Sequence, residues 1–326
     1  MRNFTFKGLL LTAVFMLLGC LSIQAANDDL ITKQITINLD KAGTLPNKIA
    51  SSEMYKITNL KIIGEINGTD WNMIREMAGR DNRGYGTEGK LSVLDLSEAK
   101  IVKGGDSYYP GDNCYTSNDE IGEKAFTDCS RLTSLTLPVG ITSIGYDAFA
   151  YCSGLTSLTL PAGITSIGEY AFSGCSGLTS LTLPAGITSI DKYAFSGCSR
   201  LTSLTLPAGI TWIGESAFSY CSGLTSIYEY AEKVPRIGRY AFKGCASRKC
   251  TLYVPKGTYD NYRLSEFGYF ENIVEFDATG IDKTTTSTDV EEVSRYSLNG
   301  QRLAVPVKGL NIVKYSDGSE RKVVVK

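Results

Sequence analysis

Apolar side chains return at a fixed interval along the middle of the chain. Four units run back to back from Leu132 to Gly223 and share the form L-T-S-L-T-L-P-x-G-I-T-x-I-x-x-x-A-F-x-x-C-S-x. The interval of 23 residues separates the members of three columns: Leu135, Leu158, Leu181 and Leu204; Phe149, Phe172, Phe195 and Phe218; Cys152, Cys175, Cys198 and Cys221. This pattern is typical of a stacked repeat protein, because one short unit cannot bury its apolar face alone.

Each unit divides into a strand and a return segment. Leu135 and Leu137 alternate with Ser134 and Thr136, which predicts a short parallel strand with buried leucines and outward hydroxyls. Pro138 ends that strand. Two isoleucines then return to the core, and the Ala-Phe-x-x-Cys segment is expected to close the coil as a short helical turn or loop.

Residues 1–26 are typical of an export leader. Two basic residues precede the apolar run Leu9–Leu21, which is too short for a comfortable membrane span, and cleavage is expected near Ala25. A rival interpretation takes Cys20 as the lipidated residue of a lipoprotein box. Both interpretations place the mature chain outside the cytoplasm.

Residues 27–90 lack the repeat and are expected to form an N-terminal cap. Residues 35–39 alternate like a strand, residues 57–66 form a second strand candidate, and a helix is expected after Thr69. A solenoid needs such a cap because its first unit would otherwise expose an apolar edge. Capping is therefore favoured over a binding role.

The first unit carries an insertion. It starts at Leu91, and the next unit starts 41 residues later, which is 18 more than the interval of 23. The extra residues, about 103–119, include Tyr108, Tyr109 and Tyr115. Insertions in a repeat map to loops on one face, often the binding face, so these tyrosines are candidate ligand contacts. A packed surface loop is the alternative.

The last units depart from the pattern. Trp212 stands in a serine column at an outward position, and the unit after it is two residues longer and has a basic bias. A basic patch could meet acidic glycans or proteins, or could simply be a solvated cap. The candidate ligand contacts in this region are Trp212, Tyr228, Tyr230, Arg236, Arg239 and Lys243.

Cysteine also follows the repeat. Six cysteines share one column: Cys129, Cys152, Cys175, Cys198, Cys221 and Cys245. Residues of one column point the same way rather than at one another, so we expect a structural ladder of buried thiols. Cys114 and Cys250 lie outside the column, and an exported chain leaves open whether they form disulfides.

Composition restricts the chemistry. The chain has no histidine and a net charge of -1, which excludes imidazole catalysis and His-ligated metal and argues against a nucleic-acid partner. Asp147, Glu169, Asp191 and Glu215 lie near one outward column and leave a carboxylate-based hydrolase as a weak alternative. We expect no enzyme, no cofactor, no metal site and a monomer.

The end of the chain has a different pattern. Residues 276–290 are typical of a linker, and Asn299-Gly300 and Asp317-Gly318 predict hairpins within residues 291–326. This last segment resembles the C-terminal sorting segments of the Bacteroidetes type IX secretion route. The resemblance implies an address that is removed or anchored at the cell surface.

The repeat itself carries a resemblance. The phrase A-F-x-x-C-x-x-L-T-S-L-T-L-P-x-x-I-T-x-I-G, first seen at Ala125–Gly145, resembles the BspA-like, or Treponema-type, leucine-rich repeats of bacterial surface proteins. The matches extend over roughly residues 30–275. They imply an α/β repeat solenoid: a right-handed leucine-rich-repeat coil over residues 91–275, with one short parallel strand per 23-residue unit. An N-terminal α+β cap and a small β-rich tail complete the expected chain.

The resemblance also implies a function. Members of this group are regarded as surface adhesins, so we expect an exported cell-surface protein that contacts host matrix proteins, glycans or other bacteria. The outward Ser and Thr columns support one alternative, a structural or ice-binding surface. Specificity is expected where the repeat is broken: the Tyr-rich insertion, Trp212 and the basic last units.

Overall fold

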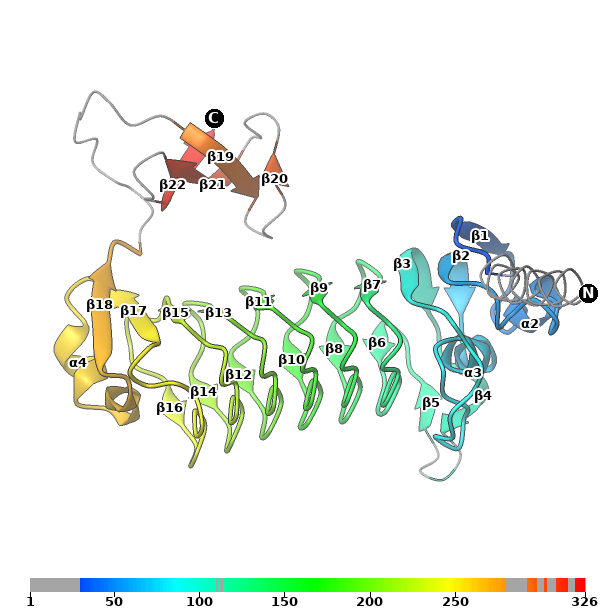
Figure 1. Ribbon diagram of the computed structural model, residues 1–326, viewed down its shortest axis with the longest axis horizontal. Helices are drawn as coiled ribbons and strands as arrows, with labels where there is room; N and C mark the ends of the chain where they lie inside the picture. The colour runs from blue at the N-terminus through cyan, green and yellow to red at the C-terminus, as the bar shows by residue number, and fades with distance from the viewer. Residues whose placement is uncertain are drawn as a thin grey trace, which may run out of the picture.

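The computed structural model describes residues 30–109, 111, 114–278, 292–297, 302–303, 309–315 and 320–325. The expected leader, most of the expected linker, and both the Asn-Gly and Asp-Gly turns of the tail lie outside these residues. From residue 30 to residue 278 the chain winds into an elongated solenoid with a cap at each end (Figure 1).

The first row of strands forms two parallel sheets that follow one another along the solenoid. The order is β1-β2-β3-β7-β9 in one sheet and β11-β13-β15-β17-β18 in the next. Within each sheet, neighbouring strands come from successive units and pair in parallel, as Leu135 does with Leu158. The strands are β1 (Ile35–Leu39), β2 (Asn59–Ile66), β3 (Val93–Ile101), β7 (Ser134–Thr136), β9 (Ser157–Thr159), β11 (Ser180–Thr182), β13 (Ser203–Leu206), β15 (Ser226–Glu229), β17 (Thr251–Pro255) and β18 (Asn272–Phe276).

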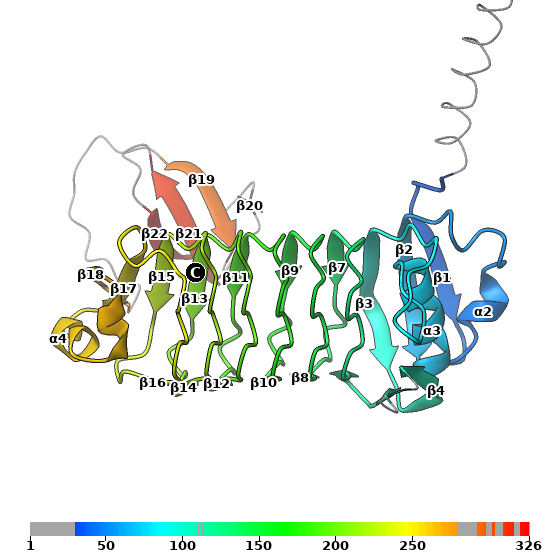
Figure 2. The same ribbon diagram turned by 60° about the horizontal axis from the view of Figure 1, so that its bottom comes forward.

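A second row of very short parallel strands runs along the solenoid, where the sequence predicted one strand per unit (Figure 2). These strands form two three-stranded sheets, and within each sheet the strand of one unit pairs with that of the next, as Ile144 does with Ile167. The strands are β6 (Glu120–Ile121), β8 (Ser143–Ile144), β10 (Ser166–Ile167), β12 (Ser189–Ile190), β14 (Trp212–Ile213) and β16 (Arg236–Ile237). The remainder of each unit closes through hydrogen-bonded turns.

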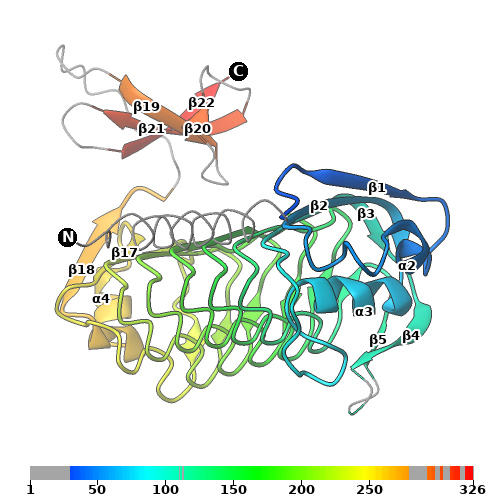
Figure 3. The same ribbon diagram turned by 45° about the vertical axis from the view of Figure 1, so that its right-hand side comes forward.

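The described helices lie in the two caps. The N-terminal cap contains α2 (Leu45–Lys48) and α3 (Gly68–Met77), and the hairpin of β4 (Gly104–Tyr109) and β5 (Cys114–Thr116) lies beside α3 (Figure 3). The C-terminal cap contains α4 (Tyr259–Arg263) and the 3-10 helix η2 (Glu266–Tyr269). The α component of the expected fold is therefore confined to the ends.

The C-terminal segment forms a separate antiparallel sheet in the order β20-β19-β21-β22. Its strands are β19 (Glu292–Ser297), β20 (Arg302–Leu303), β21 (Gly309–Tyr315) and β22 (Glu320–Val325). β19 pairs with β20 and β21 pairs with β22, as the two predicted hairpins require.

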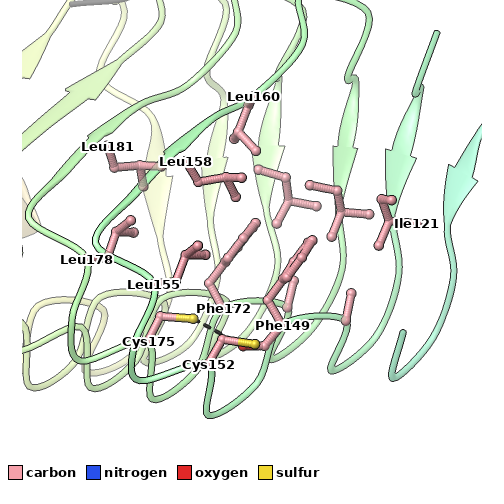
Figure 4. Packing of buried hydrophobic residues seen from close by; sticks show 14 of the residues in the cluster. Ile121, Phe149, Cys152, Leu155, Leu158, Leu160, Phe172, Cys175, Leu178 and Leu181 are labelled. Atoms are coloured by element: carbon pink, nitrogen blue, oxygen red, sulfur yellow. Dashed lines mark hydrogen bonds between the residues drawn. The ribbon is translucent and has the colours of Figure 1, made fainter. Parts of the chain in front are cut away.

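A column of stacked phenylalanine rings runs through the solenoid. Figure 4 shows two of its members, Phe149 and Phe172. Phe172 and Phe195 stack with ring centroids 5.1 Å apart and an interplanar angle of 4°. The ring of Trp71 from α3 continues the column at 5.1 Å from Phe126. Phe270 packs at 5.2 Å against Phe242 at the other end. The two caps therefore seal a single apolar core, to which every unit adds one aromatic ring.

A threonine column stabilises the start of each unit. The Thr156 hydroxyl donates to the Thr133 carbonyl at 3.1 Å, and the Thr179 hydroxyl donates to the Thr156 carbonyl at 3.2 Å. The same contact recurs at Thr202 and Thr225. These hydroxyls satisfy carbonyl lone pairs between neighbouring turns, which explains why the repeat keeps Thr at this position.

Each turn places residues in the left-handed backbone region. One such column reads Asp128, Tyr151, Gly174, Gly197, Tyr220 and Gly244, with φ between 59° and 80°. An L side chain in this region costs about 1–2 kcal/mol relative to glycine. The repeat therefore favours glycine here, and the two tyrosines occupy strained positions.

We expect Gly197→Ala to lower the free energy of unfolding by about 1 kcal/mol. A Cβ at Gly197 would meet its nearest neighbour at 3.7 Å, so the loss comes from the φ of 75° and not from a clash. Gly209→Ala is the matched control, because its nearest neighbour is also at 3.7 Å and its φ is ordinary. Equal urea midpoints for the two variants would contradict the strain argument.

Candidate binding surface

The insertion after the first unit's strand is a packed hairpin and not an open loop. Tyr108 on β4 is 1% exposed, and its hydroxyl donates to the Glu123 carbonyl at 2.8 Å. The expectation that Tyr108 contacts a ligand is therefore wrong. Burial raises the pKa of its phenol well above the ordinary value.

Tyr108 is one of several side-chain donors that cap the carbonyls of the first turn of the solenoid. In the regular turns, a backbone N–H donates to the next turn's carbonyl, as Lys124 does to Tyr146. The first turn has no preceding turn, so the Tyr108 hydroxyl donates to Glu123 instead. In the same way the Trp71 indole donates to the Ala125 carbonyl at 2.9 Å, and Arg75 also reaches this carbonyl.

We expect Tyr108→Phe to destabilise the protein by about 1–3 kcal/mol, since the Glu123 carbonyl loses this buried donor. Tyr109→Phe is the neighbouring control. The Tyr109 ring lies beneath the cations of Arg75 and Lys124, at 5.3 and 5.2 Å, and phenylalanine keeps a ring there. If thermal unfolding gives both variants the same midpoint, the hydroxyl of Tyr108 does not cap the first turn.

The other tyrosines of the insertion differ in exposure. Tyr109 is half-buried under Arg75 and Lys124, whereas Tyr115 on β5 is 53% exposed. Only Tyr115 of the three candidates presents most of its ring to solvent.

The structure separates the remaining aromatic candidates into two groups. Trp212 on β14 is 40% exposed, and its register neighbour on β16 is Arg236. Tyr228 instead stacks on Tyr253 at 4.6 Å, and Tyr230 packs edge-on against Phe276 at 5.1 Å. Burial raises the pKa of Tyr230 to about 12. Tyr228 and Tyr230 therefore pack at the C-terminal end of the first row of strands.

The three basic candidates lie together on the last complete turn. Arg236, Arg239 and Lys243 are exposed, and the last two stand over the ring of Tyr240 at 5.8 and 5.0 Å. We call Arg236, Arg239, Tyr240 and Lys243 the basic turn.

Sequence reasoning missed a row of tyrosines on the edge formed by the turns that precede and follow the Ala-Phe pair. We call this edge the turn edge. Tyr170 and Tyr193 stack at 4.8 Å, and Tyr146 meets Tyr170 at 5.8 Å. The most exposed members of the row are Tyr146, Tyr151, Tyr220 and Tyr240. The recurrence of Tyr in two columns of the repeat was the available signal.

The six column cysteines are buried and carry free thiols, and Cys114 and Cys250 are also buried and outside any disulfide. In the regular turns each thiol donates to the carbonyl of a phenylalanine one turn earlier, as Cys175 does to Phe149 at 3.1 Å. Burial raises the pKa of the Cys129 thiol to about 11. These thiols are therefore packed and protonated rather than reactive.

The outward carboxylates do not form a cleft. Asp147, Glu169 and Asp191 occupy three adjacent columns of the turn edge, and Asp191 is exposed. Burial raises the pKa of Asp147, which is half-buried. In the residues described, no group of three Cys, Asp or Glu side chains has metal-binding geometry.

One carboxyl is buried where the repeat carries leucine. Glu229 on β15 pairs in register with Leu206 and is 0% exposed. Its Oε1 accepts from the Ala231 N–H at 2.9 Å, whereas Oε2 has no hydrogen-bond partner within the described part of the chain. Burial raises its pKa from 4.5 to about 8.

Residues 119–249 match, in six copies, the family model described as the BspA type leucine rich repeat region. This segment is therefore similar to BspA-type leucine-rich repeats. The array includes Trp212 and the basic turn, whereas the N-terminal hairpin and the tail lie outside it. No curated protein matches the sequence.

Several solved structures resemble the chain. A leucine-rich repeat protein of Treponema pallidum is 30% identical, with a TM-score of 0.39 over 42% of this chain and 63% of its own. A leucine-rich cell surface protein of Faecalibacterium prausnitzii is 23% identical, with a TM-score of 0.34 over 67% of this chain and 51% of its own. A leucine-rich repeat protein of Bacteroides ovatus is 20% identical, with a TM-score of 0.32 over 75% of this chain and 70% of its own. The chain thus spans less than two thirds of the length of the first two of these proteins.

No helix among the described residues is long and apolar enough to cross a membrane.

Proposed function

We propose that this chain is an exported, adhesin-like binding module, displayed at the cell surface or released, that contacts a host matrix protein, a glycan or another bacterium. The observation that carries the proposal is the exposure of large aromatic side chains on a rigid array. Trp212 is 40% exposed, and Tyr151, Tyr220 and Tyr240 are 56–59% exposed. Exposed Trp and Tyr on a fixed scaffold are frequent anchors of interfaces.

The repeat structure supports a binding role for the turn edge. The outward columns of the first row of strands carry small, uncharged residues: Ser134, Ser157 and Ser180 in one column, and Thr136 and Thr159 in another. Such columns offer hydroxyl groups but no large side chain that could anchor an interface. The turn edge combines aromatic rings with charged groups, and its backbone is held by hydrogen bonds between turns. Rigid presentation reduces the entropy lost on binding.

The test is binding of the full chain to a panel of matrix proteins, glycans and bacterial cells, followed by an aromatic triple variant. Trp212→Ser, Tyr220→Gly and Tyr240→Ser each install a residue that neighbouring turns carry in the same column, namely Ser189, Gly197 and Ser216. The fold should therefore be retained. We expect the affinity for the partner to fall at least about tenfold, or ~1.4 kcal/mol.

The matched control is the double variant Tyr85→Ser and Tyr259→Ser, which removes exposed rings from the two caps. We expect this control to bind as the unaltered chain does. Absence of binding to every member of the panel would overturn the proposed function. Binding that survives the triple variant would move the contact away from this edge.

A further inference from the structure

The last complete turn carries an exposed cation in three columns of the repeat. Arg236 occupies the column of Ser143, Ser166, Ser189 and Trp212. Lys243 occupies the column of Ser219, and Arg239 that of Glu215. In the regular turns these three columns contain a single cation, Lys192, so three cations within one turn are not required by the stacking of the turns.

These cations outnumber the acids beside them, because only Glu215, one turn before Arg239 in its column, is a near acidic neighbour on the turn edge. From residue 233 to residue 259 the chain has no Asp or Glu and seven basic residues: Lys233, Arg236, Arg239, Lys243, Arg248, Lys249 and Lys256. Arg248 is neutralised by Glu271 at 3.0 Å. Within the described ranges, no ion pair involves Arg236, Arg239 or Lys243. In the middle of the turn edge, by contrast, Lys192 lies between Glu169 and Glu215.

The three cations lie around flat aromatic rings. Arg239 and Lys243 approach the ring of Tyr240 at 5.8 and 5.0 Å, and Arg236 is three residues from Arg239, within roughly 10 Å along the backbone. Trp212 lies beside Arg236 on the adjacent strand. The surface therefore alternates positive charge with exposed ring faces and edges over two neighbouring turns.

We propose that the basic turn and Trp212 bind an acidic polysaccharide, a polymer carrying carboxylate or sulfate groups. Arg236, Arg239 and Lys243 pair with the acid groups, and the rings of Trp212 and Tyr240 pack against the sugars. The proposal names the ligand class of the proposed binding function and rests on it.

An acidic polysaccharide fits this surface better than an acidic protein. Protein interfaces concentrate their energy in a packed, desolvated centre. Here the three cations are exposed on one turn, and the two clefts lined by described cap residues include none of the basic turn. A polymer with repeated charges engages separated cations without such a centre, and attraction to it decreases as salt screens the charges.

The test compares the full chain with the triple variant Arg236→Ser, Arg239→Gln and Lys243→Ser. The two serines restore the residues of their columns, so folding should be preserved, and the unfolding midpoint checks this. The control variant removes three exposed cations from the N-terminal region through Lys33→Ser, Lys41→Ser and Lys103→Ser. The probes are heparin, polygalacturonate, neutral dextran and poly-glutamate, measured by calorimetry at low and at physiological salt.

We expect heparin, polygalacturonate or both to bind the unaltered chain and the control, and to bind the triple variant at least tenfold more weakly. Dextran should not bind, and salt should weaken the interaction. The proposal is overturned if neither acidic glycan binds, if the triple variant binds them unchanged, or if poly-glutamate binds more tightly than both. If another partner of the panel binds the unaltered chain and the Arg236, Arg239 and Lys243 variant equally well, the adhesin-like function stands and only the acidic polysaccharide is excluded as its ligand.

Discussion

Phe195→Ala is expected to lower the free energy of unfolding by about 3–5 kcal/mol. Phe195 is fully buried, and its ring stacks on Phe172 at 5.1 Å and on Phe218 at 5.3 Å. Alanine would leave a cavity that the turns on either side cannot close, because their hydrogen bonds fix the spacing between them. Urea unfolding followed by circular dichroism measures the loss.

Two further variants make this expectation specific. Phe195→Leu keeps most of the volume and should cost clearly less than alanine. Tyr85→Ala removes a ring that is 69% exposed and should change stability by no more than about 0.5 kcal/mol. A Phe195→Ala midpoint no lower than that of Tyr85→Ala would show that the aromatic column does not hold the array together.

Glu229→Gln is expected to stabilise the protein by about 3 kcal/mol at pH 7. Burial raises the pKa of Glu229 from 4.5 to about 8. Below pH 4.5 the carboxyl is protonated in both states, so the folded form has no disadvantage. As the pH rises from 4.5 to about 8, the unfolded chain releases the proton while the folded chain keeps it. Stability therefore falls through this window, and glutamine removes the fall.

The measurement is the free energy of unfolding at several values between pH 4.5 and 8.5 for the unaltered chain, Glu229→Gln and Glu232→Gln. Glu232 is exposed and three residues away, so its variant should follow the unaltered chain. The unaltered chain and Glu229→Gln should converge at the acid end and diverge as the pH rises. Parallel curves would mean that Glu229 is ionised in the folded protein.

The sequence predicted the solenoid because a fixed interval reports directly on stacking. The buried positions of Leu135, Phe149 and Cys152, and the outward position of Trp212, follow from their columns. The second row of strands was missed because Ser143–Ile144 is only two residues long. So short a segment has no alternation to detect, and only pairing with its neighbours reveals it.

The candidate contacts were harder to predict where the repeat breaks. A tyrosine in an insertion serves equally as a ligand contact or as a capping donor, and Tyr108 became a donor because the first turn has carbonyls without a preceding turn. The tyrosines of the turn edge were missed because specificity was expected only where the repeat is broken. Tyr170 and Tyr193 are recurring features, yet they lie outside the core.

Each turn is hydrogen-bonded to its neighbours in both directions. Along the strands an N–H donates to the preceding turn, as Gly168 does to Ile144, whereas at the turn edge an N–H donates to the following turn, as Phe149 does to Ala171. The N-terminal cap satisfies the carbonyls of the first turn at this edge. Because an inserted or deleted unit of 23 residues would meet the same groups on both sides, the array can change length without either cap being altered. Every such step would move the basic turn by one strand spacing, about 4.8 Å, relative to the N-terminal end. The number of repeat units therefore sets the distance between the two caps, and this distance can change in evolution without any change in the residues that either end uses for contact.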